Sequence, residues 1–337
     1  MLQSYRIVCF NTVRLQAKTQ LRHISHENAA LTTEAIATRN RVFDEEKKRQ
    51  KSEIGRIEKI EIECKTAGYK VNLIMNKKIS TPYDCAKHIS EGLVKTSIVA
   101  LYNDMIWDMH DPLPENGKLQ FLNILNPVHM EINKTYWRSC SFLLGAVLNS
   151  AFKSNVKVHL HSFPPPMIQS GCFAHYAVIN LPRWNPGCAE MTALTAEFMK
   201  MAQKNYEFEK LDVDKEVALE IFKDNPYKVE QIPSIVKKNG SVTLYRVGDH
   251  IDISKGPMMG NTYMVGRVSL TAGSKISHKA NIYSFQGVSL PKGIMLNSFA
   301  FSLLEKNASD MKPMWGMPLD KDGNTYRRLT SRITITN

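Results

Sequence analysis

The feature that most constrains the fold is a run near the middle of the chain, "HMEINKTYWRSCSFLLGAVLNSAF" at residues 129–152. Its apolar residues recur at steps of three and four, the repeat of one face of an α-helix. The positions on this face are Ile132, Tyr136, Cys140, Leu143, Leu144, Val147 and Leu148. The spacing predicts a buried helix over residues 131–152, with a core packed around it. Arg138, Ser139 and Cys140 place charged and polar groups within that helix, which indicates either a functional site or the remains of one.

The composition is that of a globular protein with room for several domains. The chain has 337 residues, of which 43% are hydrophobic and 23% are charged. This length is enough for two or three ordinary domains. No apolar run approaches the eighteen or so residues that cross a bilayer. The phosphate-binding patterns GxxxxGK[ST] and GxGxxG are both missing, so we expect neither a membrane span nor a nucleotide-driven enzyme.

Net charge and cysteine spacing narrow the class further. A net charge of +12 favours polyanionic partners, RNA above all. The six cysteines contain no CxxC pair, which argues against a zinc knuckle or a disulfide framework and favours a reducing compartment. These cysteines are Cys9, Cys64, Cys85, Cys140, Cys172 and Cys188.

The first residues have the composition of a targeting segment. Residues 1–26 contain Arg6, Arg14, Lys18 and Arg22 but no acidic residue. A basic, acid-poor stretch rich in Ser, Thr and Gln is typical of a mitochondrial presequence. A basic tail without structure is the alternative. We expect residues 1–30 to form the presequence and to take no part in the fold.

Residues 31–57 are predicted to form a charged helical extension. The segment "EAIATRNRVFDEEKKRQKSEIGR" has few apolar residues, so it is either a surface helix with mixed charges or a helix that lies along a polyanion. On the second interpretation its basic side chains contact RNA or a neighbouring protein, together with three arginines near the C-terminus. The candidate contact residues are Arg39, Arg41, Lys47, Lys48, Arg49, Arg327, Arg328 and Arg332.

Residues 58–126 are predicted to form a compact α+β unit. "KIEIECKTAGYKVNLIM" alternates apolar and polar residues about a Gly turn, as a β-hairpin does. Thr81 can cap a helix whose first residue is Pro82 and whose first turn contains Asp84. A second hairpin turns at Asn103 and Asp104, and "KLQFLNIL" gives a last strand.

Residues 127–300 are predicted to form a second, larger α+β domain around the long helix. Two further helices are expected, at "AEMTALTAEFMKMAQKN" and "DKEVALEIF". The expected strands are "VKVHLHSF", "GCFAHYAVINL", "KVEQI", "SVTLYRV", "HIDIS", "YMVGRVSLT" and "IYSFQGVSL". Residues 301–337 are expected to form a C-terminal extension, which is expected to be irregular from Asn307 on.

Four histidines require a decision between a metal site and an ordinary position. His159 and His161 alternate on one expected strand, a spacing that suits two metal ligands, but the sequence supplies no third or fourth ligand. His175 and His250 lie in strand-like sequence and are read as polar residues with satisfied hydrogen bonds. We therefore expect no metal and no cofactor.

The order of a small α+β unit, a long helix and a mixed sheet resembles the N-terminal half of threonyl-tRNA synthetase. The residues that carry the resemblance are "RSCSFLLG" at 138–145, "QKNYEFEKLDVDKEVALEIFKDNPYKVEQI" at 203–232 and "HIDISKGPMM" at 250–259. It extends from about residue 58 to about residue 291. The resemblance implies a TGS-like β-grasp domain followed by an editing-like α+β domain.

The same resemblance implies where the editing chemistry would be, and those positions have changed. The family carries a His-x-x-x-His pair on the long helix and a Cys-x-x-x-His pair in a loop Asp-x-Cys-x-Gly-Pro-His. The corresponding residues are Arg138 and Phe142, and Ser254 and Met258. Arginine is no base near neutral pH, and phenylalanine has no lone pair. The neighbouring residues Ser139, Cys140, Leu143, Leu144, Gly145, Gly256 and Pro257 still match.

The presequence-like N-terminus, the TGS-like unit and the editing-like domain with its changed site residues together resemble a family of synthetase-derived proteins in the large subunit of the mitochondrial ribosome. The resemblance implies a structural role in the mitochondrial matrix, with contacts to large-subunit ribosomal RNA and to neighbouring ribosomal proteins, and with no small-molecule substrate. No synthetase catalytic core follows the editing-like region, so we do not expect an enzyme. Two alternatives are a trans-editing hydrolase of mischarged tRNA and a TGS-type regulator that binds RNA or a nucleotide.

Overall fold

The computed structural model describes residues 29–310 except 67, 126–129, 154, 167–170, 182–183 and 278–280. The expected presequence (apart from residues 29 and 30), Arg327, Arg328 and Arg332, and the part of the expected C-terminal extension after residue 310 lie outside this range. Within it, no helix combines the length and the apolar character that a membrane span requires.

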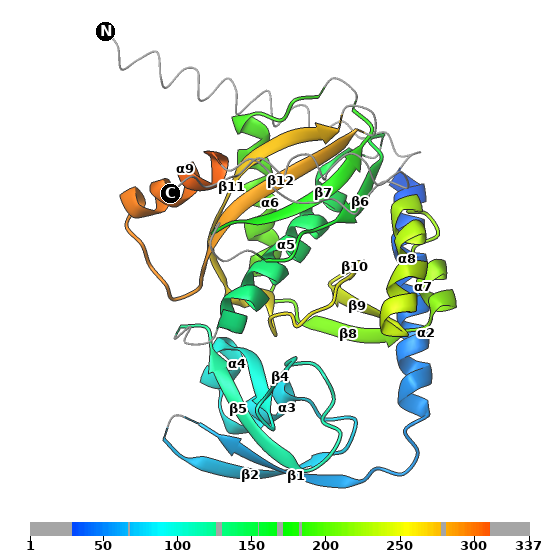
Figure 1. Ribbon diagram of the computed structural model, residues 1–337, viewed down its shortest axis with the longest axis vertical. Coiled ribbons are helices and arrows are strands. Elements are labelled where there is room, and N and C mark those ends of the chain that lie inside the picture. Colours follow the sequence, from blue (N-terminus) through cyan, green and yellow to red (C-terminus); the bar gives the residue numbers. More distant parts are fainter. Residues whose placement is uncertain are drawn as a thin grey trace, which may run out of the picture.

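A five-stranded sheet forms the lower part of the molecule in Figure 1. Its strand order is β2-β1-β5-β3-β4, with β1 parallel to β5 and the other neighbours antiparallel. The strands are β1 (Lys59–Lys65), β2 (Lys70–Asn76), β3 (Ser97–Tyr102), β4 (Met105–Trp107) and β5 (Gly117–Asn123). Two helices, α3 (Pro82–Ile89) and α4 (Glu91–Thr96), lie between β2 and β3 in the chain. This mixed sheet with its helical crossover is a β-grasp arrangement, as predicted.

Local sequence signals produce the turns of this module. The Thr81 side chain accepts a hydrogen bond from the backbone N–H of Asp84, whose carboxylate in turn accepts one from the N–H of Thr81. This capping box, with Pro82 at the first helical position, fixes the start of α3. Asn103 and Asp104 both have positive φ, which closes the β3–β4 hairpin at the predicted place.

The helix expected at residues 131–152 is α5 (Met130–Ala151), which packs against a four-stranded sheet. That sheet has the order β11-β12-β7-β6. Its strands are β6 (Val158–Ser162), β7 (Phe173–Ile179), β11 (Val265–Ser277) and β12 (Ile282–Pro291). Helix α6 (Cys188–Gln203) contacts both α5 and β11, and α9 (Ser298–Asp310) contacts β11 and β12.

The three-stranded sheet β10-β9-β8 completes the fold. Its strands are β8 (Phe208–Val213), β9 (Val242–Val247) and β10 (His250–Ile253). Three helices lie beside it: α2 (Ala29–Ser52), α7 (Lys215–Ile221) and α8 (Pro226–Asn239). Figure 1 shows α2 running alongside α7 and α8. Val42 and Phe43 of α2 are buried in the core under these helices, so α2 is anchored and not merely solvated.

Three predictions of secondary structure were wrong. "KVEQI" lies inside helix α8 and not in a strand, because Asn225 caps that helix and Pro226 occupies its first position. The segment 208–213 was not expected to be a strand, yet it is β8. Residues 307–310, expected to be irregular, belong to helix α9, since Phe301 and Ala308 of that helix pack with Cys172 and Val288 of the sheet region.

Gly145 sets how closely α5 approaches β7. A Cβ atom at this position would lie 2.6 Å from Cε1 of His175, which is closer than carbon atoms can pack. We predict that Gly145→Ala lowers the free energy of unfolding by about 1–3 kcal/mol through overpacking. Gly92→Ala in α4 is the matched control, because the new Cβ would meet only the Ser90 hydroxyl, at 3.7 Å. Urea unfolding followed by circular dichroism measures both, and a Gly145→Ala variant as stable as Gly92→Ala would contradict this packing.

Candidate functional site

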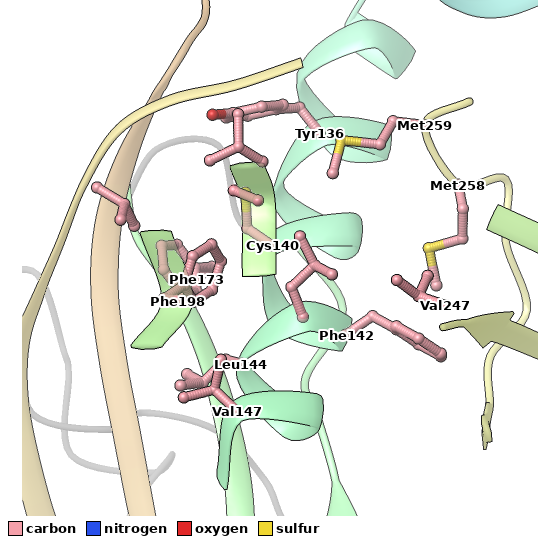
Figure 2. Packing of buried hydrophobic residues seen from close by; sticks show 14 of the residues in the cluster. Tyr136, Cys140, Phe142, Leu144, Val147, Phe173, Phe198, Val247, Met258 and Met259 are labelled. Carbon is pink, nitrogen blue, oxygen red and sulfur yellow. The ribbon is translucent and has the colours of Figure 1, made fainter. Parts of the chain in front are cut away.

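Two of the four changed positions of the editing-like domain, Arg138 and Phe142, lie on α5, and the other two, Ser254 and Met258, lie in the loop that follows β10. Figure 2 shows Phe142 pointing from α5 toward Val247 and Met258, whereas Cys140 lies on the side of Phe173 and Phe198. Phe142 and Met258 are both completely buried. Two opposite faces of the helix are therefore packed into the core.

The phenyl ring of Phe142 and the thioether of Met258 stand at two of the positions where the resemblance implies imidazoles. The Phe142 ring centroid lies 5.8 Å from that of Phe208, 6.5 Å from that of Tyr245 and 5.1 Å from that of His250. Rings at these separations pack as edge-to-face and tilted pairs. Phe142 thus fills the site with a hydrophobic group that can neither transfer a proton nor bind a metal.

Ser139 and Arg138 tie α5 to the loop that follows β10. The Ser139 hydroxyl accepts a hydrogen bond from the backbone N–H of Met259 at 2.9 Å and donates one to the carbonyl of Thr135 at 2.8 Å. The Arg138 guanidinium donates to the carbonyl of Pro257 at 2.9 Å, and its burial lowers its pKa from the ordinary value. These bonds hold the loop in place and give Ser139 and Arg138 structural partners.

The same loop has no room for additional atoms at Gly256. This residue has φ +66°, and a Cβ there would collide with the Tyr245 hydroxyl. Ser254 is buried, and its hydroxyl accepts a hydrogen bond from the N–H of Gly256 at 3.3 Å. Ser254 therefore stabilises the turn of this loop through its hydrogen bond to Gly256.

Asp108 is a residue at this site that the sequence analysis missed. It follows β4 of the β-grasp module, yet its carboxylate accepts a hydrogen bond from the Tyr245 hydroxyl at 2.7 Å and from the N–H of Met258 at 3.0 Å. No local pattern marks it, because both partners lie more than 130 residues away in the chain.

A buried polar cluster lies beyond Phe142. Lys228 of α8 forms an ion pair with Asp252 of β10, and both side chains are almost fully buried. Asp252 is the acidic residue of the Asp-x-Cys-x-Gly-Pro-His motif and is retained here. The nearby Lys228 charge holds the pKa of the Asp252 carboxyl below its ordinary value, against the opposing effect of burial.

Two histidines beside this ion pair are kept neutral by burial. The Nδ1–H of His175 donates a hydrogen bond to the carbonyl of Ser141 at 3.0 Å, and burial lowers the pKa of His175 to about 4. Burial lowers the pKa of His250 to about 3. The expectation that both are fully satisfied was wrong, because Nε2 of His175 and both ring nitrogens of His250 have no hydrogen-bond partner among the described residues. Desolvation by burial, which disfavours the charged imidazolium, is the main physical reason for the low pKa values.

His159 and His161 do not converge on a ligand. Each ring lies near Tyr227, and His161 Nδ1 is hydrogen-bonded to the Ser162 hydroxyl at 2.8 Å. Within the described ranges no group of three or more His, Cys, Asp or Glu side chains could hold a metal ion. Cys140 behaves as the small hydrophobic residue expected from its place on the apolar face, and burial raises its pKa to about 12.

Most candidate contact residues of α2 have acidic partners within the chain. Arg39 pairs with Asp224 at 2.5 Å, Lys47 pairs with Glu209 at 2.5 Å, and Arg41 and Arg49 pair with glutamates of α2 or of the turn that follows it. Lys48 has no acidic partner in the part of the chain that the structure describes. The sequence analysis could not foresee these pairs, because Asp224 and Glu209 are distant in the chain.

Comparisons with known proteins decide the family. The profile of the TGS domain matches residues 70–123, which lie within the five-stranded module. The large ribosomal subunit protein mL39 of Drosophila melanogaster is 45% identical over 291 residues, covering 85% of this chain and 87% of the fly protein. The chain belongs to the family of large ribosomal subunit protein mL39.

Members of the threonine–tRNA ligase family are more distant relatives of this mL39-family chain. Human cytoplasmic threonine–tRNA ligase 2 is 27% identical over 225 residues, which are 65% of this chain and 26% of the ligase. The ligase of Caldanaerobacter subterraneus subsp. tengcongensis is 27% identical over 248 residues, or 71% of this chain and 36% of the ligase. The chain therefore spans about a third or less of these ligases. The predicted fold, a TGS-like β-grasp domain followed by an editing-like domain, is confirmed.

The buried ion pair yields a prediction about stability. Lys228→Met leaves the Asp252 carboxylate buried without its counter-charge, which costs about 3–5 kcal/mol of unfolding free energy. The double variant Lys228→Met/Asp252→Asn removes both charges and is expected to recover most of that loss. Lys223→Met, an exposed lysine of the same region, is the control and should change stability little. Urea unfolding curves that show no recovery in the double variant would refute the pairing.

The buried histidines yield a prediction about pH. Their folded pKa values lie below the ordinary 6.5, so below about pH 6.5 the unfolded chain binds protons that the folded chain does not. The free energy of unfolding is therefore greatest above this pH and falls as the pH decreases, by up to about 1.4 kcal/mol per pH unit for each histidine.

The variant His250→Gln should have a shallower decline in stability between about pH 6.5 and 5 than the wild type. The exposed His88 on α3 provides the control, and His88→Gln should leave the slope unchanged. The measurement is thermal unfolding at half-unit pH steps. Equal slopes for the wild type and His250→Gln would show that burial does not lower the pKa of His250 in the folded protein.

Proposed function

We propose that this chain is a structural component of the large subunit of the mitochondrial ribosome and acts there without catalytic turnover. The observation that carries the proposal is the 45% identity to large ribosomal subunit protein mL39 over 85% of the chain. The packing of Phe142 and Met258 supports it, because both fill the space that an editing substrate would need.

The expected partners are ribosomal RNA of the large subunit and neighbouring ribosomal proteins in the mitochondrial matrix. A net charge of +12 favours contact with a polyanion. Lys48 is exposed on α2 and available for a phosphate without rearrangement. Arg41, Lys47 and Arg49 would have to exchange a carboxylate for a phosphate, an exchange that costs little at the surface because such ion pairs contribute about 0–1 kcal/mol. The Arg39 side chain is only 14% exposed, so its contact with RNA remains a proposal from the sequence alone. Arg327, Arg328 and Arg332 remain proposed contacts from the sequence alone.

Sedimentation of lysed mitochondria tests this function. A copy with a C-terminal epitope tag is expected to migrate with the large subunit in magnesium, and also after chelation has separated the two subunits. Its amount should approach one copy per large subunit, as for a stoichiometric structural protein. Recovery only at the top of the gradient in both conditions would reject the proposal.

A further inference from the structure

A small pocket lies where the β-grasp module meets the editing-like domain. Its volume is about 180 Å³. Helix α4 contacts the short helix η2 (Thr262–Met264) at this junction, on the side of the module that faces the rest of the molecule in Figure 1. The residues of this junction pocket are Tyr83, Glu91, Val94, Lys95, Asn205, Asn261, Tyr263 and Met264.

The junction pocket has a buried floor and a polar rim. Tyr83, Met264 and Asn261 are buried and form the floor, whereas Lys95 and Asn205 are exposed at the rim. The side-chain amide of Asn205 has no hydrogen-bond partner among the described residues and can bind a polar edge. Small-molecule pockets usually measure about 300–1,000 Å³, so this one suits a single planar group held by a longer chain outside.

Lysines surround the tyrosines of this junction. The Nζ of Lys292 lies 3.2 Å and that of Lys95 lies 5.9 Å from the ring centroid of Tyr263. Lys87 lies 4.4 Å from the ring centroid of Tyr83. Lys204 next to the pocket lies 5.6 Å from the ring centroid of Tyr206. Alternating lysines and aromatic rings are the composition of surfaces that hold single-stranded nucleic acid, where phosphates meet the cations and bases meet the rings.

The charge balance favours an anionic partner. Glu91 pairs with Lys95, and Glu207 pairs with Lys87. Lys204 and Lys292 are exposed and have no acidic partner among the described residues. Two lysines are therefore left to bind phosphates beside a cavity the size of one planar ring system.

We propose that the junction pocket receives an unpaired base of RNA, with the neighbouring phosphates bound by Lys292 and Lys204. This inference rests on the proposed ribosomal function and assigns it a specific RNA contact. RNA is favoured over a protein side chain because the uncompensated charges are positive and lie beside aromatic rings. Unpaired bases are also the part of RNA that aromatic side chains recognise.

Fluorescence anisotropy of the full chain with a fluorescein-labelled, single-stranded RNA octamer of mixed sequence tests the inference. The octamer annealed to its complement is the comparison, since a duplex offers no unpaired base. We expect tighter binding of the single strand. Tyr263→Leu should weaken it about tenfold, the size of one lost base–aromatic contact, whereas Tyr263→Phe, which keeps the ring, should bind as the wild type does.

Two lysine variants distinguish a phosphate contact at Lys292 from a general effect of the protein's charge on RNA binding. Lys292→Gln should reduce the slope of log affinity against log salt concentration by about one and also reduce the preference for the single strand. Lys306→Gln on α9 removes the same charge elsewhere and should keep that preference.

The following results would contradict either the inference or the proposed function on which it rests. Equal binding of single strand and duplex, or no change in Tyr263→Leu, overturns it. Normal RNA binding by Tyr263→Leu combined with loss of its co-sedimentation with the large subunit would assign the pocket to a protein neighbour instead. Failure of the wild type to co-sediment would instead reject the proposed function, which keeps the two tests distinct.

Discussion

The arrangement of the former site depends on the buried carboxylate of Asp108. One of its oxygens accepts hydrogen bonds from the Tyr245 hydroxyl and the N–H of Met258, and the other accepts one from the N–H of His110. A buried carboxylate is costly unless its oxygens are bonded, so these partners are effectively fixed once the chain is folded. The β-grasp module, strand β9 and the loop after β10 are thereby joined at one point, directly beside Phe142.

Around Asp108, side chains that pack the core stand at the positions where catalytic groups of the editing-like domain would be. A site that hydrolyses an ester needs an open cavity and groups that bind water or transfer protons. Here Phe142 and Met258 are completely buried, and Ser139 and Arg138 bond to the backbone of the loop. The Lys228–Asp252 pair and the two neutral histidines remain polar, but they lie inside the core. A scaffold shared with threonine–tRNA ligases thus persists with its central space filled, which suits a protein whose family is ribosomal.

Local signals in the sequence predicted much of the fold, and long-range contacts account for the rest. The apolar spacing predicted α5 to within one residue at each end, and Thr81, Pro82 and the Asn103–Asp104 turn marked element boundaries correctly. The strand prediction for "KVEQI" overlooked that its two apolar residues, Val229 and Ile232, are three positions apart, a helical spacing, and that the Asn225 cap and Pro226 before it start a helix. The identity of the changed site residues came from family resemblance, since no spacing rule marks them. The roles of Asp108, Asp224 and Glu209 depend on pairings across the fold that periodicity cannot reveal.

The most direct test of this account is a single-turnover deacylation assay. The purified chain, in excess, is incubated with seryl-tRNA(Thr), and the remaining ester is measured over time. Because Phe142 and Met258 fill the site, the account predicts hydrolysis at the rate seen without protein. Faster hydrolysis that Arg138→Ala or Ser254→Ala abolishes would contradict it, because it would show that the site still turns over a substrate through the residues now assigned to the scaffold.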